Sequence, residues 1–152
     1  MRGLTALAAT AWAAAAAAAP LFGIGGDEAP QPFLPADEAF VLSVDAPAPD
    51  RLVVRWEIAE GYYLYRSRLA FAAAEPDAVL GPPRLPPGRA TEDAFLGRQE
   101  VYHRRVAVEV PVRWQGKPRR MLTLEVRYQG CAEAGLCYPP LARTVPVILP
   151  AP

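Results

Sequence analysis

The chain has 152 residues, which is enough for one domain and a short additional segment. Its 16 Lys and Arg residues balance its 16 Asp and Glu residues, so a formal net charge of zero excludes a basic field for nucleic acid or anionic lipid. The 18 prolines argue against a helical bundle and fit short strands joined by stiff loops.

The first nineteen residues differ in character from the rest of the chain. Arg2 is followed by an apolar stretch dominated by alanine, which ends before Pro20. A charged start, an apolar middle and small residues before a cleavage point predict a secretory signal peptide at 1–19. A membrane anchor fits less well because alanine is only weakly hydrophobic, and a buried Ala-rich helix is the structural alternative. We therefore expect an exported protein, with the Gly- and Pro-rich residues 20–32 as an irregular arm.

Apolar and polar residues alternate in five segments after this arm. These segments lie at 40–44, 52–58, 105–114, 122–128 and 144–149. Alternation with a period of two, in short segments separated by turn residues, predicts an all-β, immunoglobulin-like antiparallel β-sandwich. The inter-sheet disulfide typical of antibody domains is not expected, because the only two cysteines are close in sequence. No amphipathic helix is expected after residue 19.

Four local features refine this pattern. The "QGKP" stretch at 115–118 predicts a hairpin turn between two strands. Pro111 lies inside an alternating segment and predicts an edge strand or a bulge. Five prolines between 72 and 89 predict a region that is mostly loop, with one weak strand. "TEDAFLG" at 91–97 predicts a polar loop that carries one apolar side chain, Phe95.

Both cysteines, Cys131 and Cys137, fall within the stretch "YQGCAEAGLCYPP" at 128–140. A disulfide that closes so short a ring stabilises a fold by only about 2 kcal/mol in the chain-entropy model, so it is a poor staple. A zinc or copper site would need further ligands, and the only histidine, His103, and the later methionine, Met121, lie in other segments. His103 is therefore interpreted as a surface or capping residue. The pattern leaves a reversible redox pair and a structural staple both open.

Tyrosines are concentrated in "GYYLYR" at 61–66. In a strand, Tyr63 and Tyr65 share one face and Tyr62 points to the other. Packing in the core or on the surface is the ordinary interpretation of such residues, and a role beside a reactive group is the alternative.

Four segments together resemble the N-terminal periplasmic domain of the protein-disulfide reductase DsbD. They are "FLPADEAF", "EGYYLYRSRL", "EDAFLGRQEVYHRR" and "YQGCAEAGLCYPP", in the family's order and at family-like spacing from about Phe33 to Leu149. The resemblance implies an immunoglobulin-like redox domain at 33–149, followed at 150–152 by the start of a linker.

The resemblance also implies a function. In this family the domain takes electrons from the membrane-embedded domain of the same protein. It passes them to oxidised thioredoxin-fold partners in the periplasm, such as disulfide isomerases and a cytochrome c maturation thioredoxin. We expect a periplasmic protein-disulfide reductase domain, tethered to the inner membrane in the full-length protein, that uses no metal, cofactor or nucleic acid. The competing interpretation is an exported, non-enzymatic binding module with a structural disulfide.

Carried onto this sequence, the resemblance assigns the central roles to three residues. Cys131 and Cys137 are the redox pair. Cys137 forms the mixed disulfide with the partner, and Cys131 resolves it. Phe95 is the tip of a cap loop that shields the pair until a partner displaces it.

The remaining assignments concern the surroundings of the pair. Tyr63 and Tyr65 flank the cysteines, and Asp93 is the acidic group close to them. The family pattern has a second carboxylate after this aspartate, where this chain has Ala94. Any acidic control of the thiol pKa is therefore expected to come from Asp93 or Glu92.

Overall fold

The computed structural model describes residues 33–94 and 96–151. The predicted signal peptide at 1–19, the predicted arm at 20–32 and Phe95 lie outside the described residues. Within the described part of the chain, no helix combines the length and the apolar character needed to cross a membrane.

Strands dominate the regular structure, and every strand pair is antiparallel. The helical elements are α1 (Ala36–Ala39) and a 3₁₀ turn, η1 (Arg66–Arg68). The strands are β1 (Phe40–Ala48), β2 (Arg51–Ile58), β3 (Tyr62–Tyr65), β4 (Ala70–Ala73), β5 (Ala78–Leu80), β6 (Arg89–Asp93), β7 (Gly97–Tyr102), β8 (Arg105–Trp114), β9 (Met121–Tyr128), β10 (Gly130–Ala132) and β11 (Leu141–Ile148). The predicted all-β fold is confirmed.

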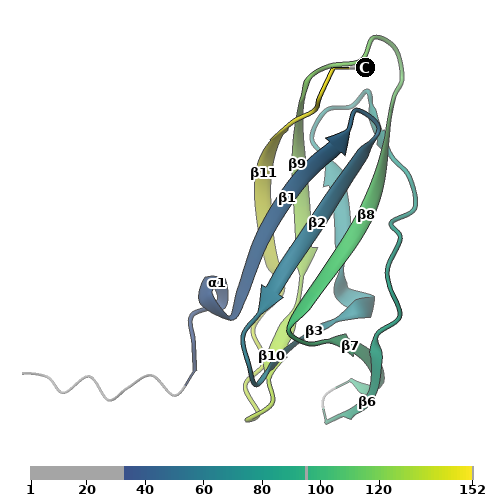
Figure 1. Ribbon diagram of the computed structural model, residues 1–152. Helices are drawn as coiled ribbons and strands as arrows, with labels where there is room; N and C mark the ends of the chain where they lie inside the picture. The colour runs from purple at the N-terminus through teal and green to yellow at the C-terminus, as the bar shows by residue number, and fades with distance from the viewer. Residues whose placement is uncertain (1–32, 95, 152) are drawn as a thin grey trace, which may run out of the picture. The chain divides into compact units, whose positions relative to one another are not determined.

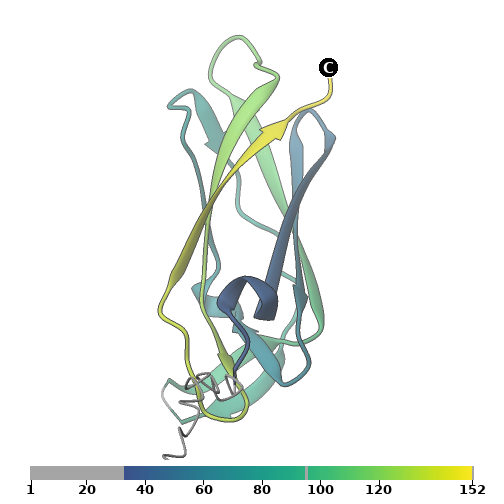
Figure 2. The same cartoon turned by 90° about the vertical axis from the view of Figure 1, so that its left-hand side faces the viewer.

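Two of the sheets form the layers of a sandwich. One has the strand order β1-β2-β8-β5 and the other β11-β9-β4. Figure 1 shows β1, β2 and β8 side by side in front of β9 and β11, and the turned view in Figure 2 separates the two layers. A third sheet, β10-β3-β7-β6, lies at one end of the sandwich.

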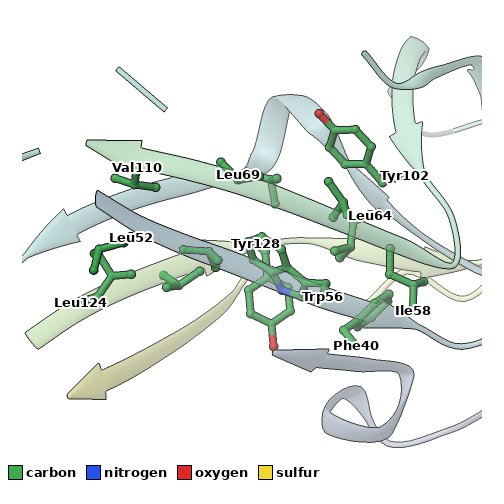
Figure 3. Close-up of a cluster of buried hydrophobic side chains, with 14 of the residues drawn as sticks. Phe40, Leu52, Trp56, Ile58, Leu64, Leu69, Tyr102, Val110, Leu124 and Tyr128 are labelled. Carbon is green, nitrogen blue, oxygen red and sulfur yellow. The ribbon is translucent and has the colours of Figure 1, made fainter. Parts of the chain in front are cut away.

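The core lies between the two layers and consists of the predicted alternating faces. In β2, Leu52, Val54 and Trp56 are fully buried, whereas Arg55 between them is exposed. Trp56 meets Tyr128 of the opposite layer edge to face, with ring centroids 5.7 Å apart. Figure 3 shows this pair at the centre of the cluster. Apolar side chains on one face of each strand thus bury the interior, as period-two alternation requires.

The predicted hairpin at 115–118 is wrong. The segment does turn, but β8 pairs with β2 and β5, whereas β9 pairs with β11 and β4. The turn therefore carries the chain from one layer to the other. Turn residues specify only that the chain reverses its direction. β8 and β9 lie in opposite sheets because their apolar faces are buried against each other.

The prediction that Pro111 marks an edge strand or a bulge is also wrong, since β8 is an interior strand between β2 and β5 and pairs with β2 through Pro111 without a register shift. On the β5 side, pairing ends at Val112, and the carbonyl of Pro111 accepts a hydrogen bond from the Gly81 N–H at 2.8 Å. A residue's N and C=O point to the same side of a strand, so the missing N–H of proline faces the segment after β5. The missing N–H of Pro111 therefore removes no hydrogen bond between β8 and its paired strands.

The polar loop predicted at 91–97 is partly a strand. Its first three residues, 91–93, belong to β6 and pair with β7, so that Asp93 lies opposite Gly97. These strands are short and carry exposed charged side chains, and the alternation rule therefore does not detect them. The single weak strand predicted between 72 and 89 is present as β5.

Candidate active site

The two cysteines form a disulfide at the edge of the third sheet. Cys131 lies in β10, and Cys137 pairs with it as an isolated antiparallel bridge. The intervening residues form a tight turn in which the Ala132 N–H donates to the Leu136 carbonyl at 2.7 Å. Gly135 adopts a φ of 104°, a region that side-chain-bearing residues rarely enter. Gly135 therefore permits the tight turn between the two cysteines.

Gly130 brings β10 into close contact with β3. A Cβ atom at this position would lie 2.4 Å from the Tyr63 carbonyl oxygen and 2.5 Å from Cζ of Phe40. Only a residue without a side chain fits there, and the next residue, Cys131, consequently pairs directly with Tyr63. The "GC" dipeptide thus places one sulfur against the tyrosine-bearing strand.

The two sulfurs differ in exposure. Cys131 is fully buried, at 0% exposed, whereas Cys137 is half-buried. Cys131 packs with Tyr65 and Val101 in a small cluster that is separate from the main core. The disulfide is therefore held outside the sandwich interior, and only the Cys137 side of the bond is open to an approaching molecule.

Tyr65 contacts both sulfurs. Its hydroxyl oxygen lies 3.2 Å from Sγ of Cys131 and 3.9 Å from Sγ of Cys137. The ring of Tyr63 packs edge to face against the ring of Tyr65, with centroids 5.4 Å apart. Both tyrosines thus flank the pair, in the positions that the resemblance implies.

Asp93 holds the two tyrosines in place. The hydroxyls of Tyr63 and Tyr65 both donate to its Oδ2 at 2.7 Å, and the Leu96 N–H donates to its Oδ1 at 2.9 Å. The residue is only 8% exposed, so its carboxylate depends on these donors for compensation. The hydroxyl of Tyr65 therefore links Asp93 to the two sulfurs.

A tyrosine hydroxyl has a single proton, and this restricts what Tyr65 can offer to a sulfur. While that proton is donated to Asp93, the oxygen of Tyr65 can only accept a hydrogen bond. A reduced Cys131 would then donate its S–H to Tyr65, an arrangement that favours the thiol over the thiolate. Burial, followed by donation to Asp93, raises the pKa of both Tyr63 and Tyr65 above the usual value of 10.0.

Raised tyrosine pKa values predict a loss of stability in alkali. Below pH 10 both states hold the phenolic proton, and above it the unfolded state loses protons that the folded state keeps. The free energy of unfolding should therefore decline as the pH rises above about 10, by at most about 1.4 kcal/mol per pH unit for one group. In urea titrations, Tyr65→Phe should reduce this decline. An unchanged slope would contradict the assignment.

The structure brings five of the six predicted site residues together, namely Cys131, Cys137, Tyr63, Tyr65 and Asp93. The sixth, Phe95, lies outside the described residues. Of the two acidic residues considered, Asp93 contacts the tyrosines, whereas Glu92 is exposed and lines a surface pocket beside the site.

His103 is the residue at this site that the sequence interpretation missed. Its Nε2 lies 3.2 Å from Oε1 of Glu133, within the turn between the cysteines, and its ring centroid is 5.9 Å from that of Tyr63. Its place at the end of the "EDAFLGRQEVYHRR" segment was the available signal. Among residues 33–94 and 96–151, no three His, Cys, Asp or Glu side chains are grouped to hold a metal ion.

Comparison with known proteins identifies the family. The family described as "Thiol:disulfide interchange protein DsbD, N-terminal" matches residues 30–149. The chain is 43% identical over 122 residues to the thiol:disulfide interchange protein DsbD of Cronobacter sakazakii, covering 80% of this chain and 20% of that protein. It is 42% identical over 111 residues to DsbD 1 of Pseudomonas aeruginosa, covering 73% of this chain and 18% of that protein. The chain thus spans about a fifth of the length of these relatives.

Solved structures agree with this result. The crystal structure of the reduced DsbD N-terminal domain of Neisseria meningitidis matches with a TM-score of 0.65 and 37% identity, covering 76% of this chain and 89% of that one. The complex between the DsbD and PilB N-terminal domains of the same organism matches with a TM-score of 0.61 and 37% identity, covering 76% and 87%. These matches confirm the predicted immunoglobulin-like sandwich. The chain belongs to the family of DsbD N-terminal domains, whose members are thiol:disulfide interchange proteins.

Proposed function

We propose that the Cys131–Cys137 pair carries two electrons to oxidised thioredoxin-fold proteins by thiol–disulfide exchange. The observation that carries this proposal is the unequal burial of the two sulfurs, with one open edge and one shielded face. The complex of the Neisseria relative with a PilB N-terminal domain supports a protein as the partner. No cofactor is required, because the two thiols themselves hold the electrons.

The exchange proceeds in two balanced steps. In the reduced domain, the Cys137 thiolate attacks one sulfur of the partner's disulfide, forming a mixed disulfide and releasing a partner thiolate that takes up a proton. Cys131 then loses its proton and attacks Sγ of Cys137, which restores the intramolecular bond and releases the second partner thiol. The domain is oxidised by two electrons and the partner's disulfide is reduced to two thiols.

The unequal burial of the two residues supports this order of attack. In thiol–disulfide exchange the attacking sulfur lines up with the disulfide bond that breaks, and Cys131 offers no exposed surface at which a partner disulfide could be reached in this way. Cys137 is half-buried and is therefore the attacking residue. Tyr65, oriented by Asp93, favours the thiol form of Cys131 until the mixed disulfide has formed.

The setting of this chemistry follows from the family. We place the domain in the periplasm, tethered to the inner membrane, as part of a protein-disulfide reductase. Electrons enter from the membrane-embedded domain of the same protein or system, and its thioredoxin-like domain is a further proposed partner. Disulfide isomerases and a cytochrome c maturation thioredoxin are the proposed acceptors.

A redox titration separates this function from a structural disulfide in a binding module. The domain is equilibrated with glutathione or dithiothreitol buffers, and the fraction of reduced Cys131 and Cys137 is measured by alkylation and mass spectrometry. A redox-active pair should titrate above about −300 mV. A potential well below that value would favour the structural staple and overturn the proposal.

We also propose that Phe95 shields the pair, as the family pattern implies. Phe95→Ala should speed the oxidation of the reduced domain by a small disulfide such as hydroxyethyl disulfide, because a smaller side chain admits the oxidant. Stopped-flow measurement of thiol loss gives the rate. Phe71→Ala, in the sandwich layer, is the control for general loosening. Equal rates for Phe95→Ala and the unmodified protein would rule out the shielding role.

A further inference from the structure

A short N-terminal segment, Phe33–Pro35, lies against the residue that follows Cys137. We call this segment the N-terminal strap. The N–H of Leu34 donates to the hydroxyl of Tyr62 at 2.8 Å, and the hydroxyl of Tyr138 donates to the carbonyl of Leu34. The second of these bonds joins residues 104 positions apart. The N-terminal end of the described domain thus meets the residue that follows Cys137.

Tyr138 is fixed by the main chain as well as by its side chain. Its N–H donates to the Gly130 carbonyl at 3.0 Å, and its own carbonyl accepts from Nε2 of Gln129 at 3.1 Å. Its ring meets Phe40 edge to face, with centroids 5.5 Å apart. The bond to Leu34 completes a clamp around the residue next to Cys137.

The strap is itself anchored to the sandwich. The carbonyl of Pro35 accepts the N–H groups of Glu38 and Ala39, at 3.0 and 2.9 Å, and these bonds form α1. The Ala39 carbonyl then accepts the N–H of Ala59, just after β2, at 2.9 Å. A force on Tyr138 is therefore transmitted to β1 and β2.

The other flank of Cys137 is held by the turn between the cysteines, in which the Ala132 N–H donates to the Leu136 carbonyl at 2.7 Å and the Glu133 N–H donates to the Gly61 carbonyl at 2.8 Å. The turn between the cysteines exposes Glu133, Ala134 and Gly135 to solvent. Cys131 is held in β10 by pairing with β3, independently of the disulfide. Once the bond between the sulfurs opens, the distance between them depends on this turn and on what holds Tyr138, the residue next to Cys137.

We propose that the N-terminal strap, through Tyr138 and Tyr62, holds Cys137 against Cys131 after reduction and thereby sets the reduction potential of the pair. Closing a disulfide within one chain becomes more favourable as the effective concentration of its two thiols rises. Tyr138 is a positioning residue in this scheme, since it acts on Cys137 and not on the partner. The inference rests on the proposed function, in which the pair opens and closes.

The hydroxyl of Tyr138 stays protonated at neutral pH and can therefore donate to Leu34 continuously. Burial, followed by a hydrogen bond with Tyr62, raises the pKa of Tyr138 to about 12. Its hydroxyl therefore keeps the proton that it donates to Leu34 at neutral pH, in both redox states of the cysteines.

The test compares Tyr138→Phe with Tyr102→Phe in the full chain. Each substitution removes one hydroxyl that donates to a loop carbonyl, Leu34 in the first case and Pro86 in the second, at 2.6 Å. Each variant is equilibrated with glutathione at pH 7. Two glutathione thiols are oxidised to glutathione disulfide, and the Cys131–Cys137 bond is reduced to two thiols.

Tyr138→Phe should shift this equilibrium about fivefold towards the reduced domain, or about 20 mV at 29.6 mV per tenfold change. Tyr102→Phe should leave it unchanged, although both variants lose thermal stability. Tyr62→Phe, which removes the other bond to Leu34, should shift the equilibrium in the same direction. A lower Tm for Tyr138→Phe with an unchanged equilibrium would mean a merely structural clamp and would overturn the proposal.

Failure of the proposed function gives a different result. In that case the unmodified protein would exchange with no thioredoxin-fold disulfide, whatever its equilibrium with glutathione. If the unmodified protein exchanges normally and Tyr138→Phe leaves the equilibrium unchanged, only the strap proposal fails.

Discussion

Cys131→Ser should form a mixed disulfide with a thioredoxin-fold partner as readily as the reduced domain does, whereas Cys137→Ser should form almost none. The reason is geometric, because Cys131 is 0% exposed and Cys137 is the half-buried sulfur. A partner disulfide cannot reach a sulfur that is fully buried and packed against Tyr65 and Val101. The rate for Cys137→Ser should be lower by roughly 100-fold or more, since buried thiols are inert towards exchange.

The measurement uses a partner variant that keeps only its attacked cysteine, activated as a mixed disulfide with thionitrobenzoate. Attack by the domain releases the coloured thiolate, so the absorbance at 412 nm reports the rate directly. Circular dichroism and urea titration of both serine variants establish that each is folded. Comparable rates for the two variants would refute the assigned order of attack.

Gly130→Ala should be the most destabilising substitution near the site. The added Cβ would lie 2.4 Å from the Tyr63 carbonyl oxygen and 2.5 Å from Cζ of Phe40. One of these contacts is to backbone and the other to a fully buried ring, so neither neighbour can move without disturbing β3 or the core. We expect a loss of about 3 kcal/mol in the free energy of unfolding, at the upper end of the usual cost of overpacking.

Gly81→Ala is the matched control for this substitution. Its Cβ would approach side-chain atoms of Pro111 at 3.0 Å and would meet no atom closer than that. Urea unfolding of the two variants should therefore show a clearly smaller loss for Gly81→Ala. Equal stabilities for Gly130→Ala and the unmodified protein would contradict the close packing of β10 on β3.

The strands that could be predicted are those with one buried face. β1, β2, β8 and β9 each alternate over five or more residues, because every second side chain enters the core, and β11 alternates only in its second half. β6 and β7 carry charged side chains, and β10 has only three residues. Their sequences therefore show no alternation of apolar and polar residues from which a strand could be predicted. Which strands pair could not be inferred from local turns, as the connection at 115–118 demonstrates.

The site itself was predictable only in part. Spacing placed Tyr63 and Tyr65 on one face of a strand, and family resemblance added Asp93. The arrangement in which a single oxygen of Asp93 accepts both hydroxyls depends on the pairing of β7 with both β6 and β3, which local sequence does not encode. The bond from Tyr138 to Leu34 spans almost the whole domain and left no local signal.

The electrostatic environment of the cysteines was also predictable only in part. Tyr65 and Asp93 were identified as neighbours of the pair, but the competition for the single proton of Tyr65 follows only from the distances. Ala94 in place of a second carboxylate leaves Asp93 as the acidic group that contacts the tyrosines. We propose that the restraint of the thiols depends on this one buried carboxylate, which acts through the hydroxyl of Tyr65.

Direct transfer of electrons is the most immediate test of the account. The reduced domain is mixed with an equal amount of an oxidised thioredoxin-fold protein, quenched in acid, alkylated and analysed by mass spectrometry. The account predicts that Cys131 and Cys137 are recovered unalkylated, as a disulfide, while the partner gains two alkyl groups. Recovery of a fully alkylated domain beside an unmodified partner would contradict it.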